Sequence, residues 1–145
     1  MAPDSIPEDI LKMLNYISPN ETELARLTGG SHDTVEAIEE SAKKLIKQGV
    51  NNVLITVGKR GAMLVESGSC RMFPVMDVNV VDTTAAGDCF NAAFVVALAE
   101  GKDVDEAIAF ANIAAALSVT KKGAQNSLPT REDVACAMSE QKNIV

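Results

Sequence analysis

One short segment constrains the fold of this chain more than any other: residues 81–91, which read VDTTAAGDCFN. A β-branched run stops there at small residues and an acid, just where a long apolar helix begins. The first N–H groups of a helix have no partners within it and carry partial positive charge, so they bind an anion that side chains do not block. Ala85, Ala86 and Gly87 leave that approach open. We therefore expect a phosphate site at this turn.

Asp88, in the first turn of the same helix, has two interpretations. As a helix cap, its carboxylate would accept the free N–H groups and compete with an incoming anion. As a general base, it would take a proton from a hydroxyl group while the N–H groups hold a phosphoryl group in transfer. Taken alone, the segment favours the cap, because acids are common at helix starts.

Composition limits the class of protein. A length of 145 residues with 47% hydrophobic residues suits one domain with its own core. Abundant alanine, no Trp and one Tyr suit helices packed closely on a sheet, and a net charge of −7 disfavours nucleic-acid binding. The three cysteines are too widely spaced for a disulfide framework. With no signal peptide and no apolar run of about 18–20 residues, we expect a soluble, cytoplasmic protein without a membrane span.

The hydrophobic pattern alternates between helical and strand-like segments, which predicts an α/β fold. Residues 53–57 form a continuous apolar run, as in a strand buried on both faces of a parallel sheet. The helices are expected at 7–14, 21–27, 33–47, from 88 to about 100, from 103 onward and after Thr130, and the strands at 16–18, 53–57, 62–66 and in pairs between 70 and 81.

Two turns at predicted strand ends have polar or glycine-rich sequences. Ligands bind at the carboxyl ends of strands in parallel sheets, and at this end of the buried strand lie Thr56, Gly58, Lys59, Arg60 and Gly61. A plain hairpin turn with glycines at positive φ is the alternative. After the strand at 16–18, Asn20 and Glu23 have the spacing of a capping box, which the spacing alone favours over a binding role.

Four segments taken together resemble one known family. They are 82–88 (DTTAAGD), 20–23 (NETE), 55–61 (ITVGKRG) and 119–127 (VTKKGAQNS). In this order they are similar to the signature D-T-x-G/A-A-G-D, the N-x-x-E motif, the nucleotide loop and the late loop of the ribokinase (PfkB-type) carbohydrate kinases. Ala85 and the late loop point to the ribokinase branch. The match is to the second half of a family chain that is about twice as long.

The resemblance implies a ribokinase-like doubly wound sheet with helices on both faces. Residues 1–145 would then be the nucleotide-binding and catalytic half of that fold, a truncated form without the sugar-binding half and its lid. A sheet cut near its middle exposes an edge strand and apolar faces, so we expect a homodimer or association with an N-terminal half.

The resemblance also assigns roles to individual residues. Asp88 would be the catalytic base, with the N–H groups of Ala85, Ala86 and Gly87 stabilising the transferred phosphoryl group, and Glu23 would organise Mg²⁺ through water. The ATP contacts would come from Asn20, Thr56, Gly58, Lys59, Arg60, Gly61, Gly87 and Asn112. A monovalent cation such as K⁺ would be held by Asp82, Thr84, Ser118, Lys121, Gly123 and Ser127, mostly through backbone oxygens. Without the resemblance, Asn112 is a polar group satisfied by backbone partners and 118–127 is a solvated loop.

The implied function is ATP-dependent phosphorylation of a sugar hydroxyl, with ribose to ribose 5-phosphate favoured. The alternative is a nucleotide-binding or assembly fragment without kinase activity of its own. Weak or no phosphorylation is expected from the isolated chain, since positioning and water exclusion depend on the absent half.

Overall fold

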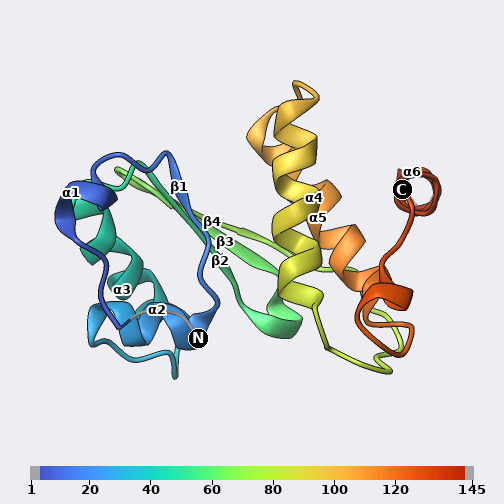
Figure 1. Ribbon diagram of the computed structural model, residues 1–145, viewed down its shortest axis with the longest axis horizontal. Helices are drawn as coiled ribbons and strands as arrows, with labels where there is room; N and C mark the ends of the chain where they lie inside the picture. The colour runs from blue at the N-terminus through green and yellow to red at the C-terminus, as the bar shows by residue number, and fades with distance from the viewer. Residues whose placement is uncertain (1–3, 143–145) are drawn as a thin grey trace. The chain divides into compact units, whose positions relative to one another are not determined.

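The structure, a computed structural model, describes residues 4–142, which form two compact units divided between residues 73 and 74. Figure 1 labels their helices and strands. Unit 1 contains α1 (Glu8–Leu11), β1 (Tyr16–Ile17), α2 (Glu21–Thr28), α3 (Val35–Lys47), β2 (Asn52–Thr56), the 3₁₀ turn η1 (Gly58–Arg60), β3 (Ala62–Glu66) and β4 (Ser69–Phe73). Unit 2 contains α4 (Ala86–Ala99), α5 (Val104–Ser118), the 3₁₀ turn η2 (Gln125–Ser127) and α6 (Arg131–Lys142).

Unit 1 is built on a four-stranded sheet in the order β1-β2-β3-β4. Strand β1 runs parallel to β2, with Ile17 opposite Val53, whereas β2, β3 and β4 form successive antiparallel hairpins. Thr56 pairs with Ala62, so the turn at 57–61 closes the first hairpin. The run at 53–57 is therefore a buried strand, as expected, but it pairs in parallel on one side only.

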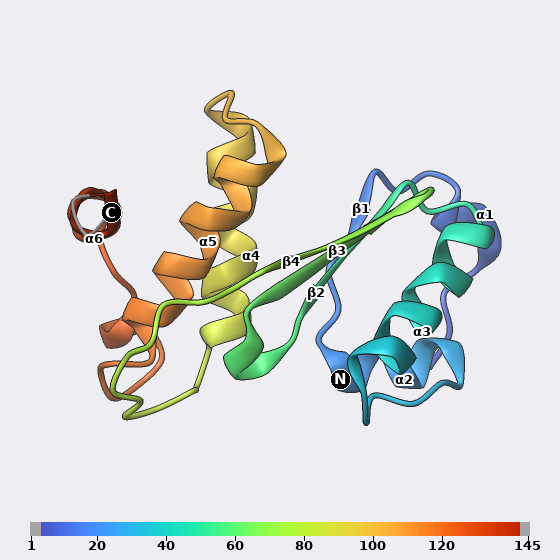
Figure 2. The ribbon, with the colours of Figure 1, turned by 180° about the vertical axis from the view of Figure 1, so that it is seen from behind.

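Helices α1, α2 and α3 lie on one face of this sheet (Figures 1 and 2). Their apolar side chains form one cluster with alternate residues of β2 and β3; its buried members are Leu11, Leu24, Ile38, Ala42, Leu45, Val50, Val53, Ile55, Val57, Met63 and Val65. Leu54 and Leu64 point to the opposite face and are fully buried as well. The sheet is thus apolar on both faces, as the doubly wound expectation requires.

Local chemistry explains where the helices of unit 1 begin and end. The Asn20 side chain caps α2, and Gly29 ends that helix in the left-handed region at φ 64°. The Thr34 hydroxyl accepts the Ala37 N–H at 3.1 Å and starts α3. The predicted helices at 21–27 and 33–47 are confirmed to within two residues. The one predicted at 7–14 is only a single turn, α1, because the chain then turns to enter β1, where the Leu14 carbonyl accepts the Asn51 N–H.

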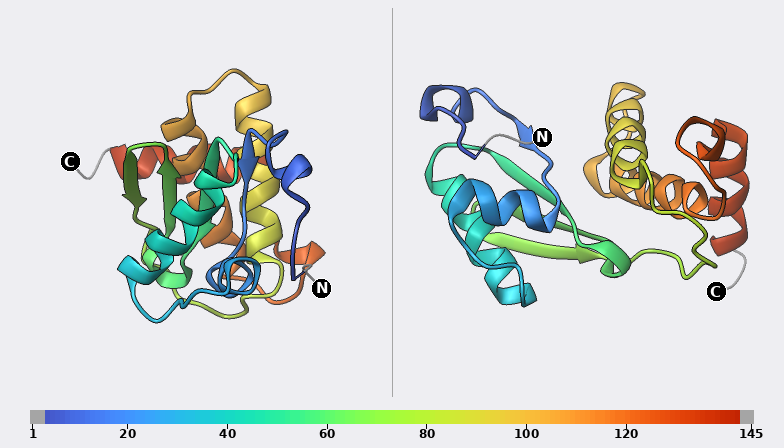
Figure 3. Two further views of the ribbon diagram at one scale, coloured as in Figure 1. Left: turned by 90° about the vertical axis from the view of Figure 1, so that its left-hand side faces the viewer. Right: turned by 60° about the horizontal axis from the view of Figure 1, so that its bottom comes forward.

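Unit 2 is a helical unit in which α4 and α5 lie side by side and α6 packs against α5 (Figure 3). Phe90, Phe94 and Ala97 of α4 are buried, and α5 is buried along most of its length. Alanines at the contact let helix axes approach closely. The helices expected from 103 and after Thr130 are present, with Asp103 capping α5 and Thr130 capping α6, and Arg131 pairs with Glu100 at the end of α4.

One expectation for unit 2 is wrong. Strand pairs were expected between 70 and 81, but only β4, which ends at Phe73, is present, and residues 74–81 contain no strand. A strand needs a ladder partner, and the Val81 N–H instead donates to the Val119 carbonyl. Val95 and Val96 lie outside the buried face of α4, since they are 62% and 47% exposed. Within residues 4–142, no helix is long and apolar enough to span a bilayer.

Candidate active site

The start of α4 carries unpaired backbone donors. The residue that precedes the helix, Ala85, has φ 61° and ψ 11°, the left-handed conformation that alanine rarely adopts. No side chain caps the helix, and within residues 4–142 no acceptor takes the N–H groups of Gly87 or Asp88. A Cβ built on Gly87 would meet nothing within 4 Å. An open space beside two free donors is what an anion site at a helix start requires.

The Asp88 carboxylate lies in the first turn of α4, is exposed, and makes no hydrogen bond within the described chain. It does not accept the Ala85 N–H or any other N–H group of its own helix. The helix-cap interpretation of Asp88 is therefore wrong. Its role as a general base stays a prediction, and a carboxylate with both oxygens free is in the state that this role needs.

The loop before α4 is held in place through Asp82. One Asp82 oxygen accepts the Thr84 N–H at 2.9 Å and the Thr84 hydroxyl at 2.6 Å, and the other accepts the Gly123 N–H at 3.1 Å. The hydroxyl of Thr84, followed by the backbone donors of Thr84 and Gly123, lowers the pKa of Asp82 to about 2. The Val119 carbonyl accepts the N–H groups of Val81 and Asp82 at 2.7 and 3.1 Å. These contacts tie the loop to the end of α5 and to the following loop.

Asp82 is thus in direct contact with Thr84 and with Gly123, two other members of the predicted cation set. Ser118 and Ser127 are buried, and their hydroxyls donate to the carbonyls of Ala115 and Ala124, each at 2.8 Å, which leaves hydroxyl lone pairs available. Although the middle of 118–127 is exposed, its two buried serines show that it is not a wholly solvated loop. These oxygens suit a weakly hydrated cation, and the site stays a prediction.

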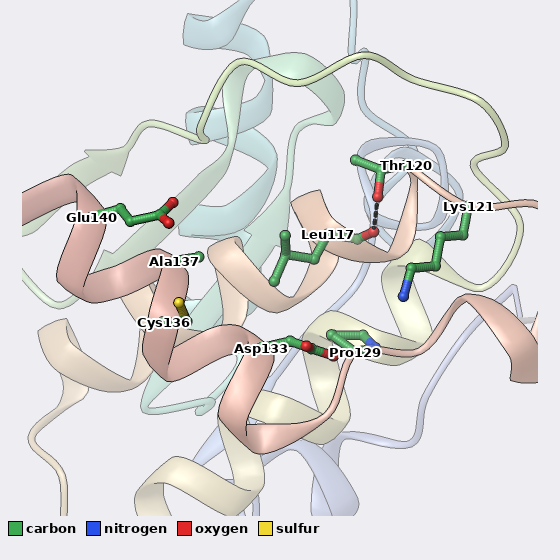
Figure 4. Close-up of a pocket in the computed structure, with 8 residues that line it drawn as sticks. All are labelled: Leu117, Thr120, Lys121, Pro129, Asp133, Cys136, Ala137 and Glu140. Carbon is green, nitrogen blue, oxygen red and sulfur yellow. Dashed lines mark hydrogen bonds between the residues drawn. The ribbon is translucent and has the colours of Figure 1, made fainter.

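Lys121, the remaining member of the cation set, lines a cavity of about 330 Å³ between α5 and α6 (Figure 4). Asp133, Cys136 and Glu140 of α6 line the same cavity, opposite Leu117 of α5. The ammonium group therefore takes no part in the Asp82 contacts. A contact from the Lys121 backbone carbonyl to a cation stays a prediction.

In unit 1, the predicted nucleotide loop is a closed turn. The Val57 N–H donates to the Gly61 carbonyl at 2.8 Å, and the Arg60 N–H donates to the Val57 carbonyl at 3.0 Å. Gly58 and Gly61 have φ values of 51° and 97°, so both positions favour glycine. The hairpin interpretation is confirmed. The binding role of this turn, including the exposed Lys59, stays a prediction.

The same end of the sheet carries the other predicted nucleotide contacts of unit 1. Asn20 and Thr56 form an isolated bridge where β1 and β2 end, and the Thr56 N–H donates to the Pro19 carbonyl at 3.3 Å. The Arg60 guanidinium is 3.9 Å from a Glu21 carboxylate oxygen. Asn20, Thr56 and the turn at 58–61 therefore lie together, as the sequence predicts for strand ends.

Asn20 and Glu23 form the capping box that their spacing predicts. The Asn20 side chain accepts the Glu23 N–H at 2.8 Å, and a Glu23 carboxylate oxygen accepts the Asn20 N–H at 3.0 Å. The second Glu23 oxygen is not used in this box. Residues 4–142 hold no group of three or more His, Cys, Asp or Glu side chains placed to bind a metal. Glu23 could thus hold Mg²⁺ only with help from water and phosphate oxygens.

Asn112 on α5 is 5% exposed, and its side-chain amide donates to the Pro74 carbonyl at 3.4 Å. The structural interpretation, a buried polar group paired with the backbone, is confirmed, whereas contact with an adenine ring stays a prediction. Sequence reasoning missed the anchoring role of the Val119 carbonyl. No signal could have revealed it, because every residue carries a backbone carbonyl.

Comparison with known proteins places these features in a family. Residues 2–131 match the family described as pfkB family carbohydrate kinase. The ribokinase of Haemophilus influenzae is 43% identical over 128 residues, which cover 88% of this chain and 42% of that protein. The ribokinase of Arabidopsis thaliana is 44% identical over 131 residues, covering 89% of this chain and 35% of that protein.

Solved structures give the same result. The structure of Arabidopsis thaliana ribokinase complexed with ribose and ATP has a TM-score of 0.87 and 43% identity, covering 92% of this chain and 44% of that one. The ribokinase of Thermotoga maritima has a TM-score of 0.83 at 43% identity, covering 92% and 45%. The chain spans less than half the length of these relatives, and its mixed sheet with helices has their ribokinase-like fold. It belongs to the pfkB family of carbohydrate kinases.

Proposed function

We propose that this chain is the ATP-binding and catalytic-base half of a kinase that phosphorylates a sugar hydroxyl, with ribose as the favoured substrate and ribose 5-phosphate as the product. The observation that carries the proposal is the start of α4, where two free N–H donors stand beside an unbonded carboxylate. The relative solved with ribose and ATP supports the choice of both ligands.

In the proposed reaction, a primary hydroxyl of the sugar attacks the γ-phosphorus of ATP in line. Asp88 takes the proton of that hydroxyl as the new O–P bond forms, and the bond to the bridging oxygen breaks to release ADP. The free backbone N–H groups of Gly87 and Asp88 stabilise the negative charge on the transferred group, whereas the Ala86 N–H, expected from the sequence to take part, donates to the Thr83 carbonyl at 3.2 Å. In the transfer step Asp82 acts by positioning, because its two oxygens hold the loop that presents these donors.

Two ions complete the proposed site. Glu23 would hold Mg²⁺ through water, and the ion would supply positive charge beside the phosphates of ATP. K⁺ would be held by the oxygens around Asp82, Thr84 and Ser118, with carbonyls of the loop at 121–127. In unit 1, the turn at 57–61 and Asn20 would contact the nucleotide, and in unit 2 Asn112 would approach the adenine ring.

A titration calorimetry experiment tests the phosphate site. A non-hydrolysable ATP analogue, with Mg²⁺ and K⁺, is titrated into the wild-type chain, Gly87→Arg and the control Gly87→Ala. Because a Cβ at Gly87 meets nothing within 4 Å, both variants should fold. We expect saturable binding in the wild type and in Gly87→Ala, and loss of binding in Gly87→Arg. Equal binding by all three proteins would contradict a phosphate site at α4.

A second candidate, a nucleotide-binding or assembly fragment without kinase activity, is favoured by one observation: the chain covers only 42% of the Haemophilus influenzae relative. Binding of the analogue without turnover of ATP and ribose would favour the binding module. A melting temperature unchanged by ATP, Mg²⁺ and K⁺ would favour the assembly fragment. In either case we propose that the chain associates with a second copy or with an N-terminal half.

A further inference from the structure

One buried carboxylate oxygen in unit 1 accepts no hydrogen bond. It is Oε2 of Glu21, the first residue of α2, and it is shielded from water in the described part of the chain. Buried polar atoms in folded proteins are nearly always paired, because an unpaired one costs free energy. The exception at Glu21 therefore needs a physical cause.

The start of α2 does not supply that cause. Asn20 and Glu23 already exchange both hydrogen bonds of the capping box. Glu21 gains only the general attraction between a carboxylate and the N-terminus of a helix, which does not require one of its oxygens to be buried. The position of the Glu21 side chain thus has a cause outside its own helix.

The cation that faces the buried oxygen is Arg60, in the turn at 57–61. Its Nη2 atom is 3.9 Å from Oε2 of Glu21, which is an ion pair but too long for a hydrogen bond. The parallel pairing of β1 and β2 brings the two residues together, because the bridge between Asn20 and Thr56 sets the start of α2 beside the turn. The Arg60 side chain is 47% exposed, yet it has a fixed negative charge on one side.

A fixed charge beside Arg60 restricts a side chain that is otherwise free to change rotamer. The backbone of the turn is closed, since the Arg60 N–H donates to the Val57 carbonyl, but the long side chain loses conformational freedom when it binds a ligand. A guanidinium has five N–H donors in one plane, so the edge that faces Glu21 leaves other donors free. Glu21 can thus order Arg60 in advance without using up its donors.

We propose that Glu21 is a positioning residue, which holds the Arg60 guanidinium at the nucleotide turn so that its remaining donors meet the phosphates of ATP. When the phosphates bind, the guanidinium bridges them and the Glu21 carboxylate, and the buried oxygen gains its donor. The contact with ATP rests on the proposed function, whereas the ordering of Arg60 by Glu21 does not.

Charge repulsion alone would have the opposite effect on binding. A carboxylate near a phosphate site repels the ligand, so if Glu21 acted only through its charge, Glu21→Gln would tighten the binding of ATP. If Glu21 acts by ordering Arg60, the same variant weakens binding by about three- to tenfold, which corresponds to the cost of ordering one long side chain. The sign of the change separates the two effects.

NMR relaxation of nitrogen-15 tests the ordering in the ligand-free chain. In Glu21→Gln, the order parameter of the Arg60 Nε–H bond should fall from its wild-type value to below about 0.6, as in a flexible group. Glu66→Gln is the matched control, because Glu66 faces Arg71 at 3.6 Å with similar exposure at the other end of β3, and it should leave Arg60 unchanged. Equal Arg60 order parameters in the wild type and Glu21→Gln would overturn the proposal.

Titration calorimetry with two ligands tests the purpose of the ordering. A non-hydrolysable ATP analogue and adenosine, which has no phosphate, are titrated into the wild type, Glu21→Gln, Arg60→Gln and the double variant. We expect Glu21→Gln to weaken only the analogue, and to weaken it no further once Arg60 is replaced. A merely structural role at the start of α2 would weaken both ligands alike. That result, or tighter binding of the analogue by Glu21→Gln, would overturn the proposal.

The two experiments together separate this inference from the proposed function. A wild-type chain that binds no analogue, but in which Arg60 loses order in Glu21→Gln, would remove the proposed function and leave the ordering of Arg60 intact. Analogue binding that is the same in the wild type and Glu21→Gln would remove the role of Glu21 and leave the proposed function intact.

Discussion

Helices α2 and α4 begin in different units with the same arrangement, an acid three residues after the capping position, yet only one of these acids serves its helix. In α2, Glu23 accepts the N–H of Asn20, and the Asn20 side chain accepts the N–H of Glu23. In α4, Ala85 has no side-chain acceptor, and Asp88 takes no N–H group within residues 4–142. The acid at the start of α2 therefore stabilises its own helix, whereas the acid at the start of α4 does not.

The conformation of the capping residue accounts for this difference. Asn20 is extended, with φ −80° and ψ 172°, the geometry in which a capping box closes. Ala85 is left-handed at φ 61°, a conformation that costs about 1–2 kcal/mol for an L-residue. Strain that persists at an uncapped helix start indicates a functional position. The start of α4 therefore has the features of a functional position, whereas the similar motif at the start of α2 has those of a structural cap.

Exchange of the two acids for amides should give the largest effect. The test uses a single chain in which this sequence is joined to the segment of Haemophilus influenzae ribokinase that it does not match. In that fused chain, Asp88→Asn should lower ribose-dependent ATP turnover about 10²–10⁴-fold, because general-base assistance is lost. Analogue binding and melting temperature should change little, since Asp88 makes no hydrogen bond. Glu23→Gln keeps a box-forming side chain and should lower turnover only through its proposed hold on Mg²⁺, so a higher Mg²⁺ concentration should restore turnover in Glu23→Gln but not in Asp88→Asn. Equal losses in both variants would remove the distinction between the two helix starts.

The two capping residues should respond in opposite directions. Asn20→Ala should lower the free energy of unfolding by about 1 kcal/mol, because α2 loses its cap. Ala85→Gly should raise it by a few tenths to about 1 kcal/mol, because relief of the left-handed strain exceeds the added entropy of the unfolded chain. Urea unfolding followed by circular dichroism measures both. A destabilised Ala85→Gly would show that Ala85 is not strained.

The smallest effect concerns pH. The pKa of Asp82 is about 2, below its ordinary value of 3.8, so the native state binds the proton less readily than the unfolded chain. The stabilisation from Asp82 should be complete above about pH 4 and should be lost as the pH falls through about 2. The Gly123 amide shift in NMR spectra should report this titration, and Asp82→Asn should abolish it. A midpoint near pH 4 would contradict the contacts with Thr84 and Gly123.

The elements that the sequence predicted correctly are those whose bounds depend on residues close to them in the chain. The starts of α2, α5 and α6 follow from the caps Asn20, Asp103 and Thr130, and the turn at 57–61 follows from its glycines. The segment at 74–81 could not be predicted in the same way, because a strand depends on a partner from elsewhere in the chain. The exposure of Val95 and Val96 likewise depends on what packs against α4.

The sequence by itself determined the family, the alternation of helices and strands, and the candidate residues, because motifs and hydrophobic periodicity are local properties. Only the tertiary structure decided that Asp88 does not cap its helix. The carbonyl of Val119 and the carboxylate of Asp82 hold the loop before α4 through contacts that cross 38 and 41 residues of chain, respectively. Such contacts form only when the chain is folded, since their partners are brought together by packing and not by spacing along the sequence.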